Sequence, residues 1–208
     1  MTSPLPGDGK STVALNLAAA LSMSGQPVML IDADLRRPVM AESLGLVEGV
    51  GLTDVLIGGV QVEEVVQRVA GLPNLAVLAA GPVPPNPSEM LGSKSMRRLL
   101  KRLRKDYTVI IDAPPLLPVT DAAVLSAAAD GALVVVSSGR TLDTQLRDAL
   151  GNLSAVSGHT LGVVLNRVPP RSSASGYYGG YYGNSAKGRR VPRDQEQAQE
   201  PADLPLAV

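Results

Sequence analysis

A glycine-rich segment near the start of the chain, residues 6–12 (PGDGKST), constrains the fold more than any other feature. Its glycines allow consecutive backbone N–H groups to converge on an anion, and a helix-like apolar pattern follows directly over residues 11–24. Such a loop, with Lys-Ser-Thr at a helix N-terminus, is typical of phosphate-binding P-loops. The usual first glycine of the motif is Pro4 here, and a glycine-rich turn before an ordinary helix is the alternative interpretation.

The polar residues of this segment have expected contacts if it is a P-loop. We expect Lys10 to reach the β- and γ-phosphates, Ser11 to hold Mg²⁺ and Thr12 to contact the phosphate chain. The predicted nucleotide-binding residues of the segment are Gly7, Asp8, Gly9, Lys10, Ser11 and Thr12.

Short β-rich apolar runs alternate with helix-like segments along the chain. Most of the runs are apolar on both faces, as buried parallel strands are. Strand and helix in repetition predict an α/β fold with a doubly wound, mostly parallel sheet, in which ligands bind at the carboxyl ends of the strands. The expected strands are 28–31, 75–78, 108–111, 132–136 and 161–165, and the expected helices are 11–24, 93–105 and 144–156.

Two of the expected strands end in carboxylates. Asp32 and Asp34 follow the first strand two residues apart, on the same side of an extended segment, and such a pair can share a magnesium shell or accept a proton from a hydroxyl. Asp112 ends a later strand in the manner of a Walker B aspartate, which binds magnesium through water. Each signal alone also fits a polar turn. Together, and in this order, the three predict a nucleotide-binding P-loop NTPase fold.

The composition excludes several chemistries. The chain has no Cys, which excludes disulfides, zinc-thiolate sites and thiol nucleophiles. Its single His, His159, excludes His-rich metal sites. Nineteen basic residues balance nineteen acidic ones, so we expect no nucleic-acid partner. No apolar run approaches the roughly 20 residues that span a bilayer, and no signal-peptide pattern opens the chain. We therefore expect a cytoplasmic protein whose membrane contact is made through a partner.

The aromatic residues are concentrated where no core is expected. The chain has no Phe or Trp, and four of its five tyrosines are Tyr177, Tyr178, Tyr181 and Tyr182. From residue 169 onward the sequence is rich in Ser, Gly and Tyr, then in Pro, Gln, Glu and Ala, and it has no apolar periodicity. We expect an ordered ATP-binding domain over 1–168 and a disordered tail with the tyrosine cluster over 169–208.

With these motifs the chain resembles the bacterial tyrosine kinases (BY-kinases) of capsular and exopolysaccharide synthesis, over about residues 1–183. Residues 32–36 (DADLR) resemble the additional Walker A′ motif of that family, and residues 86–91 (NPSEML) and 162–166 (GVVLN) resemble further family segments. The resemblance implies an ATP- and Mg²⁺-dependent protein-tyrosine autokinase. Such an enzyme phosphorylates its own C-terminal tyrosine cluster and regulates polysaccharide polymerisation and export.

The resemblance also makes Asn166 a candidate for contacting the adenine base. A tyrosine hydroxyl has a pKa of about 10, so it needs a nearby base and a γ-phosphate held in line. We expect Asp32 to assist the incoming hydroxyl, and Asp34 and Asp112, with Ser11, to organise Mg²⁺. The division of roles between Asp32 and Asp34 stays open. The predicted catalytic residues are Lys10, Asp32, Asp34 and Asp112.

Partners follow from the resemblance as well. It implies a membrane activator protein of a polysaccharide co-polymerase, which recruits the kinase to the inner face of the membrane. It also implies a ring-like homo-oligomer in which the tail of one copy enters the site of a neighbour.

The sequence departs from the family pattern at its start. Only residues 1–6 precede the glycines, so the strand that should enter the P-loop is missing, as is a Glu- and Arg-containing oligomerisation helix. We expect an N-terminally shortened domain with two unpaired sheet edges facing the gap. Its stability and its oligomerisation should be weaker than those of a chain extended upstream.

Two alternatives remain. Septum-site and partition ATPases share the fold, but they carry a signature lysine where this chain has Leu5, and they lack a terminal tyrosine cluster. The second alternative is a nucleotide-binding regulatory subunit that is inactive because of its short N-terminus. Tyrosine phosphorylation separates the kinase from the partition-type ATPase, and ATP binding without turnover identifies the regulatory subunit.

Overall fold

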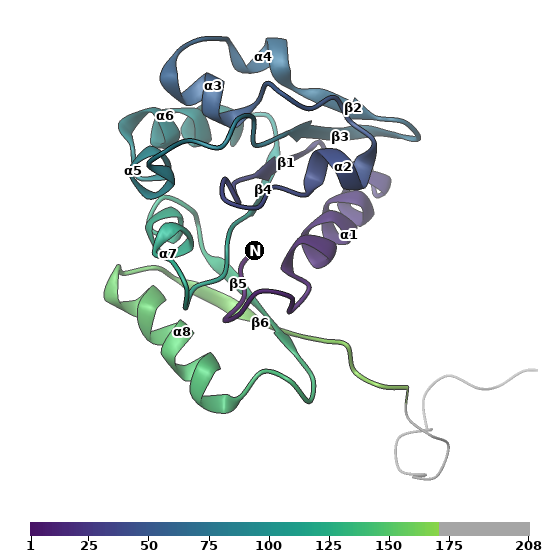
Figure 1. The fold of residues 1–208 in the computed structure, drawn as a ribbon. Coiled ribbons are helices and arrows are strands. Elements are labelled where there is room, and N and C mark those ends of the chain that lie inside the picture. Colours follow the sequence, from purple (N-terminus) through teal and green to yellow (C-terminus); the bar gives the residue numbers. More distant parts are fainter. Residues whose placement is uncertain (171–208) are drawn as a thin grey trace, which may run out of the picture. The chain divides into compact units, whose positions relative to one another are not determined.

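A computed structural model describes residues 1–170 of the chain, and Met1–Pro169 forms one compact unit (Figure 1). The predicted tyrosine cluster lies outside the described residues. None of the described helices combines the length and the apolar character needed to cross a bilayer.

The strands form two sheets. The larger sheet has the order β2-β3-β1-β4, in which β1 pairs in parallel with β3 and β4, while β2 is antiparallel to β3; β5 and β6 form a separate parallel pair. The predicted α/β fold with a mostly parallel sheet is confirmed. The strands are β1 (Val28–Asp32), β2 (Gln67–Val69), β3 (Leu72–Leu78), β4 (Thr108–Asp112), β5 (Ala132–Ser137) and β6 (Thr160–Asn166).

Three longer helices correspond to the three that the sequence predicts, and five shorter ones were not predicted. The longer ones are α1 (Lys10–Met23), α6 (Lys94–Leu103) and α8 (Asp143–Ala155). The shorter ones are α2 (Met40–Leu44), α3 (Leu52–Ile57), α4 (Val62–Val65), α5 (Pro87–Leu91) and α7 (Asp121–Ser126).

Strand β1 is buried along its whole length because helices cover both faces of the sheet (Figure 1). Leu30 packs on one face with Ala14 and Ala18 of α1, whose small side chains let the helix approach the sheet. Met29 belongs to the opposite face, where it shares a core with Leu99 of α6. This two-sided burial explains the continuous apolar run in the sequence, and it leaves the end of β1 as the place where polar side chains emerge.

Residues 1–3 occupy the space between β4 and β5. The backbone N–H of Thr2 donates to the carbonyl of Leu133 (3.0 Å), and the N–H of Val135 donates to the carbonyl of Thr2 (2.8 Å). On the other side, the α-amino group of Met1 donates to the carbonyl of Ile111 (2.7 Å). A three-residue stub with a single parallel bridge therefore stands where the sequence analysis placed the missing strand.

An apolar cavity of about 270 Å³ lies beside this stub. Leu17 and Leu21 of α1 line it, together with Val109 of β4, Leu133 of β5 and Leu161 of β6. Beyond residues 1–3, β4 pairs with β1 and β5 pairs with β6 in the described part of the chain. Residues 1–3 thus pair with part of each strand edge, which the sequence analysis expected to be unpaired, and the expected effect of the short N-terminus on stability stays a prediction.

Candidate active site

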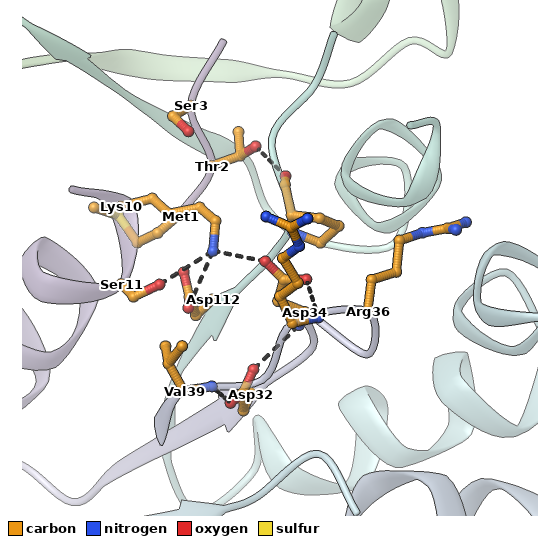
Figure 2. Close-up of polar contacts among 12 residues, drawn as sticks. Met1, Thr2, Ser3, Lys10, Ser11, Asp32, Asp34, Arg36, Val39 and Asp112 are labelled. Carbon is orange, nitrogen blue, oxygen red and sulfur yellow. Dashed lines mark hydrogen bonds and ion pairs between the residues drawn. The ribbon is translucent and has the colours of Figure 1, made fainter. Parts of the chain in front are cut away.

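The predicted motifs meet at the carboxyl ends of β1 and β4 (Figure 2). The two strands run in parallel register with Asp32 opposite Asp112, so their terminal carboxylates emerge side by side. The P-loop leads into α1, whose first residue is Lys10. A pocket of about 760 Å³ opens at this point. Its lining includes Gly7, Gly9, Lys10, Ser11, Thr12, Asp34, Arg36, Arg37 and Arg167.

Lys10 links the motifs to one another. Its ammonium nitrogen lies 2.9 Å from Oδ2 of Asp34 and 3.5 Å from Oδ2 of Asp112, and it donates to Oγ of Ser11 at 3.1 Å (Figure 2). The lysine is 9% exposed, so these charges interact with little screening by water. The structure thus brings together four predicted site residues from three separate segments.

Asp112 carries an unsatisfied oxygen. The side chain is fully buried, and its Oδ1 has no hydrogen-bond partner among the residues that the structure describes. Burial raises the pKa of Asp112, although the Lys10 ammonium opposes this shift. A buried carboxylate oxygen without a partner, near a serine hydroxyl and a second carboxylate, matches the hard oxygen donors that Mg²⁺ prefers.

The set of protein ligands at this point is small. The described residues hold no group of three or more His, Cys, Asp or Glu side chains that could bind a metal ion by themselves. Magnesium usually keeps several waters and binds through one or two carboxylates together with substrate phosphates. The residues present, Ser11, Asp34 and Asp112, therefore fit a magnesium ion that arrives with a nucleotide.

Asp8, which belongs to the P-loop, and Arg140, which follows β5, both form hydrogen bonds that fix the conformation of the loop. The buried carboxylate of Asp8 accepts hydrogen bonds from the N–H of Leu5 (3.1 Å) and from Oγ1 of Thr141 (3.0 Å). The guanidinium of Arg140 donates to the carbonyls of Pro6 (3.2 Å) and Gly7 (3.1 Å). The side chain of Asp8 is not among the residues that line the pocket, so its contribution is to hold the loop in shape.

Gly9 is required by both conformation and space. Its φ of +94° lies in the left-handed region, and a Cβ there would stand 2.2 Å from Nδ2 of Asn166. Nδ2 of Asn166 in turn donates to the carbonyl of Asp8 at 2.9 Å. Asn166 therefore packs on the P-loop from the end of β6, and its predicted contact with adenine stays a prediction.

Asp32, at the end of β1, accepts hydrogen bonds from the backbone and forms no ion pair with Lys10. It is fully buried, and its carboxylate accepts hydrogen bonds from the N–H groups of Asp34 (3.2 Å), Val39 (3.0 Å) and Met40 (3.0 Å). Burial raises the pKa of Asp32 to about 6 despite these hydrogen bonds. Of the two carboxylates that follow β1 in the sequence pattern, Asp34 lines the pocket and Asp32 holds the backbone of residues 39 and 40. Assistance of the incoming hydroxyl by Asp32 stays a prediction.

Thr141, Arg36 and Asp121 were not among the predicted site residues. For Arg140, which comes shortly after an expected strand, the sequence left open a contact with phosphate or with a partner. In the structure Arg140 contacts the P-loop itself. The predicted phosphorylation sites Tyr177, Tyr178, Tyr181 and Tyr182 lie outside the described residues.

Similar sequences are known. A family model described as an AAA domain matches residues 6–145. The chain is 42% identical over 181 residues to the tyrosine-protein kinase YwqD of Bacillus subtilis (strain 168), which covers 86% of this chain and 76% of that protein. It is 33% identical over 186 residues to the tyrosine-protein kinase CpsD of Streptococcus agalactiae, which covers 87% of this chain and 80% of that protein.

Similar structures agree with these sequences. The kinase domain of the Escherichia coli tyrosine kinase ETK matches with a TM-score of 0.79 and 35% identity, over 86% of this chain and 70% of that one. The chimerical protein CapA2B2 matches with a TM-score of 0.77 and 35% identity, over 81% of this chain and 75% of that one. The cell division protein MinD of Aquifex aeolicus matches less well, with a TM-score of 0.63 and 26% identity over 81% and 68%.

Proposed function

The chain belongs to the family of bacterial tyrosine kinases, and we propose that it transfers the γ-phosphoryl group of ATP to its own C-terminal tyrosines. The observation that carries this proposal is the convergence of Lys10, Ser11, Asp34 and Asp112 at one pocket, with an unpartnered buried oxygen on Asp112. The proposed acceptors are Tyr177, Tyr178, Tyr181 and Tyr182.

Binding of ATP uses the residues of the P-loop. The backbone N–H groups between Gly7 and Thr12 and the ammonium of Lys10 hold the β- and γ-phosphates. Because Lys10 is paired with Asp34 and Asp112, the phosphates compete with these carboxylates for its charge. Ser11, Asp34 and Asp112 would hold Mg²⁺, which would neutralise part of the charge on the phosphates.

Asp32 is the proposed acceptor of the tyrosine proton. Its pKa of about 6 makes it a stronger base than an ordinary aspartate, and a base is more effective when its pKa approaches the operating pH. Its Oδ2 accepts two backbone hydrogen bonds and its Oδ1 only one, so Oδ1 can accept a further proton donor. Because Asp32 is fully buried, this role requires the segment 34–40 to move and admit the hydroxyl. Asp34 already lines the pocket and is the second candidate for the same role.

The regulatory part of the proposal concerns assembly. We propose that a membrane activator protein of a polysaccharide system recruits the kinase to the inner face of the membrane, and that the tail of one copy reaches the site of a neighbour. Each phosphate adds about −1.5 to −2 charge, so a phosphorylated tail is repelled by the acidic site and leaves it. Light scattering should then report a lower oligomer mass after full phosphorylation.

Phosphopeptide mapping after incubation with Mg-ATP tests the kinase reaction. The wild type should carry phosphate on the tyrosine cluster and none on Tyr107, which lies between α6 and β4 and serves as the internal control. The Lys10→Met variant should carry none. ATP hydrolysis without phosphotyrosine would indicate a partition-type ATPase, and ATP binding without turnover would indicate a regulatory subunit.

A further inference from the structure

A second polar cluster lies beside the nucleotide pocket. Asp121, the first residue of α7, is fully buried, and its Oδ2 accepts a hydrogen bond from Nε of Arg36 at 2.8 Å. Its Oδ1 accepts from Nη2 of Arg36 at 3.2 Å and from the hydroxyl of Ser88 on α5. One carboxylate thus joins three segments that are distant in the sequence.

The charge of Asp121 depends on these partners. Burial disfavours the ionised carboxylate, but the hydrogen bonds from Arg36 and Ser88 outweigh burial and hold its pKa below the ordinary value. The same contact with Asp121 raises the pKa of Arg36. The Arg36 side chain is 41% exposed whereas that of Asp121 is fully buried. Loss of Arg36 would therefore leave a buried carboxylate without its cation, whereas loss of Asp121 would leave the guanidinium in contact with water and free to leave this position.

Arg36 connects this pair to the turn that carries Asp34. The N–H of Arg37 donates to the backbone carbonyl of Asp34 at 3.2 Å and to its Oδ1 at 3.1 Å, which closes a tight turn over residues 34–37. Asp32 binds the backbone after this turn through Met40. The turn is therefore fixed on one side by Asp32 and on the other by the Arg36 side chain, with Asp34 between the two anchors.

We propose that Asp121 is a positioning residue of the nucleotide site. By fixing Arg36 it holds the 34–37 turn so that the carboxylate of Asp34 faces Lys10 and the magnesium that accompanies ATP, and Ser88 supports Asp121 from α5. This inference rests on the proposed function. Arg36 lines the pocket and Asp121 does not, so an effect of Asp121 on the site must pass through Arg36.

Binding of a fluorescent ATP analogue at increasing Mg²⁺ concentration tests the proposal on the full chain. In Asp121→Asn the Mg²⁺ concentration for half-maximal binding should rise about tenfold, as for residues that orient a metal ligand. Binding measured in EDTA should be unchanged. In Ser88→Ala, which removes one hydrogen bond to the carboxylate and leaves the two from Arg36, the rise should be about threefold.

Asp130→Asn is the matched control. Asp130 is an exposed carboxylate that lies 3.8 Å from Arg104, so its replacement removes an ion pair of the same type away from the pocket. Its Mg²⁺ dependence should equal that of the wild type. A lower melting temperature of Asp121→Asn with unchanged Mg²⁺ dependence would overturn the proposal, because the pair would then be structural only.

A double-mutant cycle separates positioning from direct contact. The variant that combines Arg36→Gln with Asp121→Asn should need no higher Mg²⁺ concentration for half-maximal binding than the more affected single variant. A concentration raised by the product of the two single effects would overturn the proposal. If Asp121→Asn does not fold, Arg36→Lys decides in its place. This variant keeps the positive charge but cannot form the two parallel hydrogen bonds of the guanidinium to Asp121. The Mg²⁺ concentration for half-maximal binding should therefore rise, and an unchanged value would overturn the proposal.

The measurement is independent of phosphoryl transfer. A wild type that binds Mg-ATP but leaves its tyrosines unmodified would defeat the proposed kinase reaction and leave the role of Asp121 standing. A normal kinase whose Asp121→Asn variant keeps the wild-type Mg²⁺ dependence would defeat only the role of Asp121.

Discussion

Lys10 and Asp34 form an ion pair of 2.9 Å in which both side chains are almost fully buried. The partners of this lysine are the same carboxylates that are proposed to hold magnesium. If Mg-ATP binds as proposed, the lysine would pair with phosphate and the carboxylates with the cation, so one set of charge pairs would replace another. In the structure without nucleotide, the Lys10 ammonium balances part of the negative charge of these carboxylates.

Replacement of Lys10 by Met should destabilise the nucleotide-free protein. The change leaves the buried carboxylates of Asp34 and Asp112 without their cation, and loss of one partner of a buried pair costs about 3–5 kcal/mol. Urea unfolding without nucleotide measures the difference. Lys10→Met combined with Asp34→Asn should regain part of the loss, and equal stability of Lys10→Met and wild type would contradict the argument.

Asp112→Asn should remove the response to magnesium without lowering the stability of the nucleotide-free protein. Burial raises the pKa of this carboxyl, and its Oδ1 has no partner in the described residues, so a neutral side chain relieves an unfavourable charge. Lys10 keeps its closer partner, Asp34, in this variant. The wild type should melt at a higher temperature with ATP and Mg²⁺ than with ATP and EDTA. A variant that keeps this difference would show that Asp112 is not a magnesium ligand.

Gly9→Ala and Gly25→Ala form a matched pair that isolates the close contact in the P-loop. The two glycines have φ values of +94° and +92°, but a Cβ at Gly25 meets nothing within 4 Å, whereas one at Gly9 meets Asn166. Gly25→Ala should cost about 1 kcal/mol of unfolding free energy for its backbone alone. Gly9→Ala should cost more and weaken ATP binding. Equal losses in the two variants would mean that the contact with Asn166 is easily relieved.

The buried Asp32 should produce a pH dependence of stability. Its pKa is about 6 in the folded protein against an ordinary value of 3.8, so between these pH values the folded state binds more protons than the unfolded state. The contribution of Asp32 to the unfolding free energy is therefore complete below pH 3.8 and is lost as the pH rises through about 6. The total loss is about 3 kcal/mol. Unfolding from pH 4 to 7 should show a steeper fall in the wild type than in Asp32→Asn. Parallel curves would rule out the shifted pKa.

The sequence predicted the elements whose patterns are local and long. The buried strands, such as β1, and the helices α1, α6 and α8 carry enough consecutive residues for an apolar pattern to be read. Strand β2 has three residues with a polar start, and α2 to α5 and α7 have four to six residues each. Elements this short are stabilised by tertiary packing, because too few residues repeat to form a period.

The same distinction holds for the site. Lys10, Asp34 and Asp112 were predictable because each follows a strand or opens a helix at a fixed offset within a motif. The contacts of Arg36 with Asp121 and of Arg140 with the P-loop join residues separated by 85 and 133 positions. Such pairs have no local pattern, so only the folded chain reveals them.

The break in the sheet has a consequence for how the molecule opens. In the described part of the chain, only residues 1–3 pair with both the larger sheet and the β5-β6 pair, so we expect the two sheets to form separate cooperative units in hydrogen exchange. Amides of β1, which is paired on both sides, should exchange last, and those of β5 earlier. The nucleotide pocket spans this seam, because the P-loop is held by Arg140 and Asn166 while Asp34 and Asp112 follow the larger sheet. Mg-ATP bound as proposed should therefore stabilise both units against opening, and its clearest signature would be slower exchange in β5 and β6, which carry none of the proposed Mg²⁺ ligands.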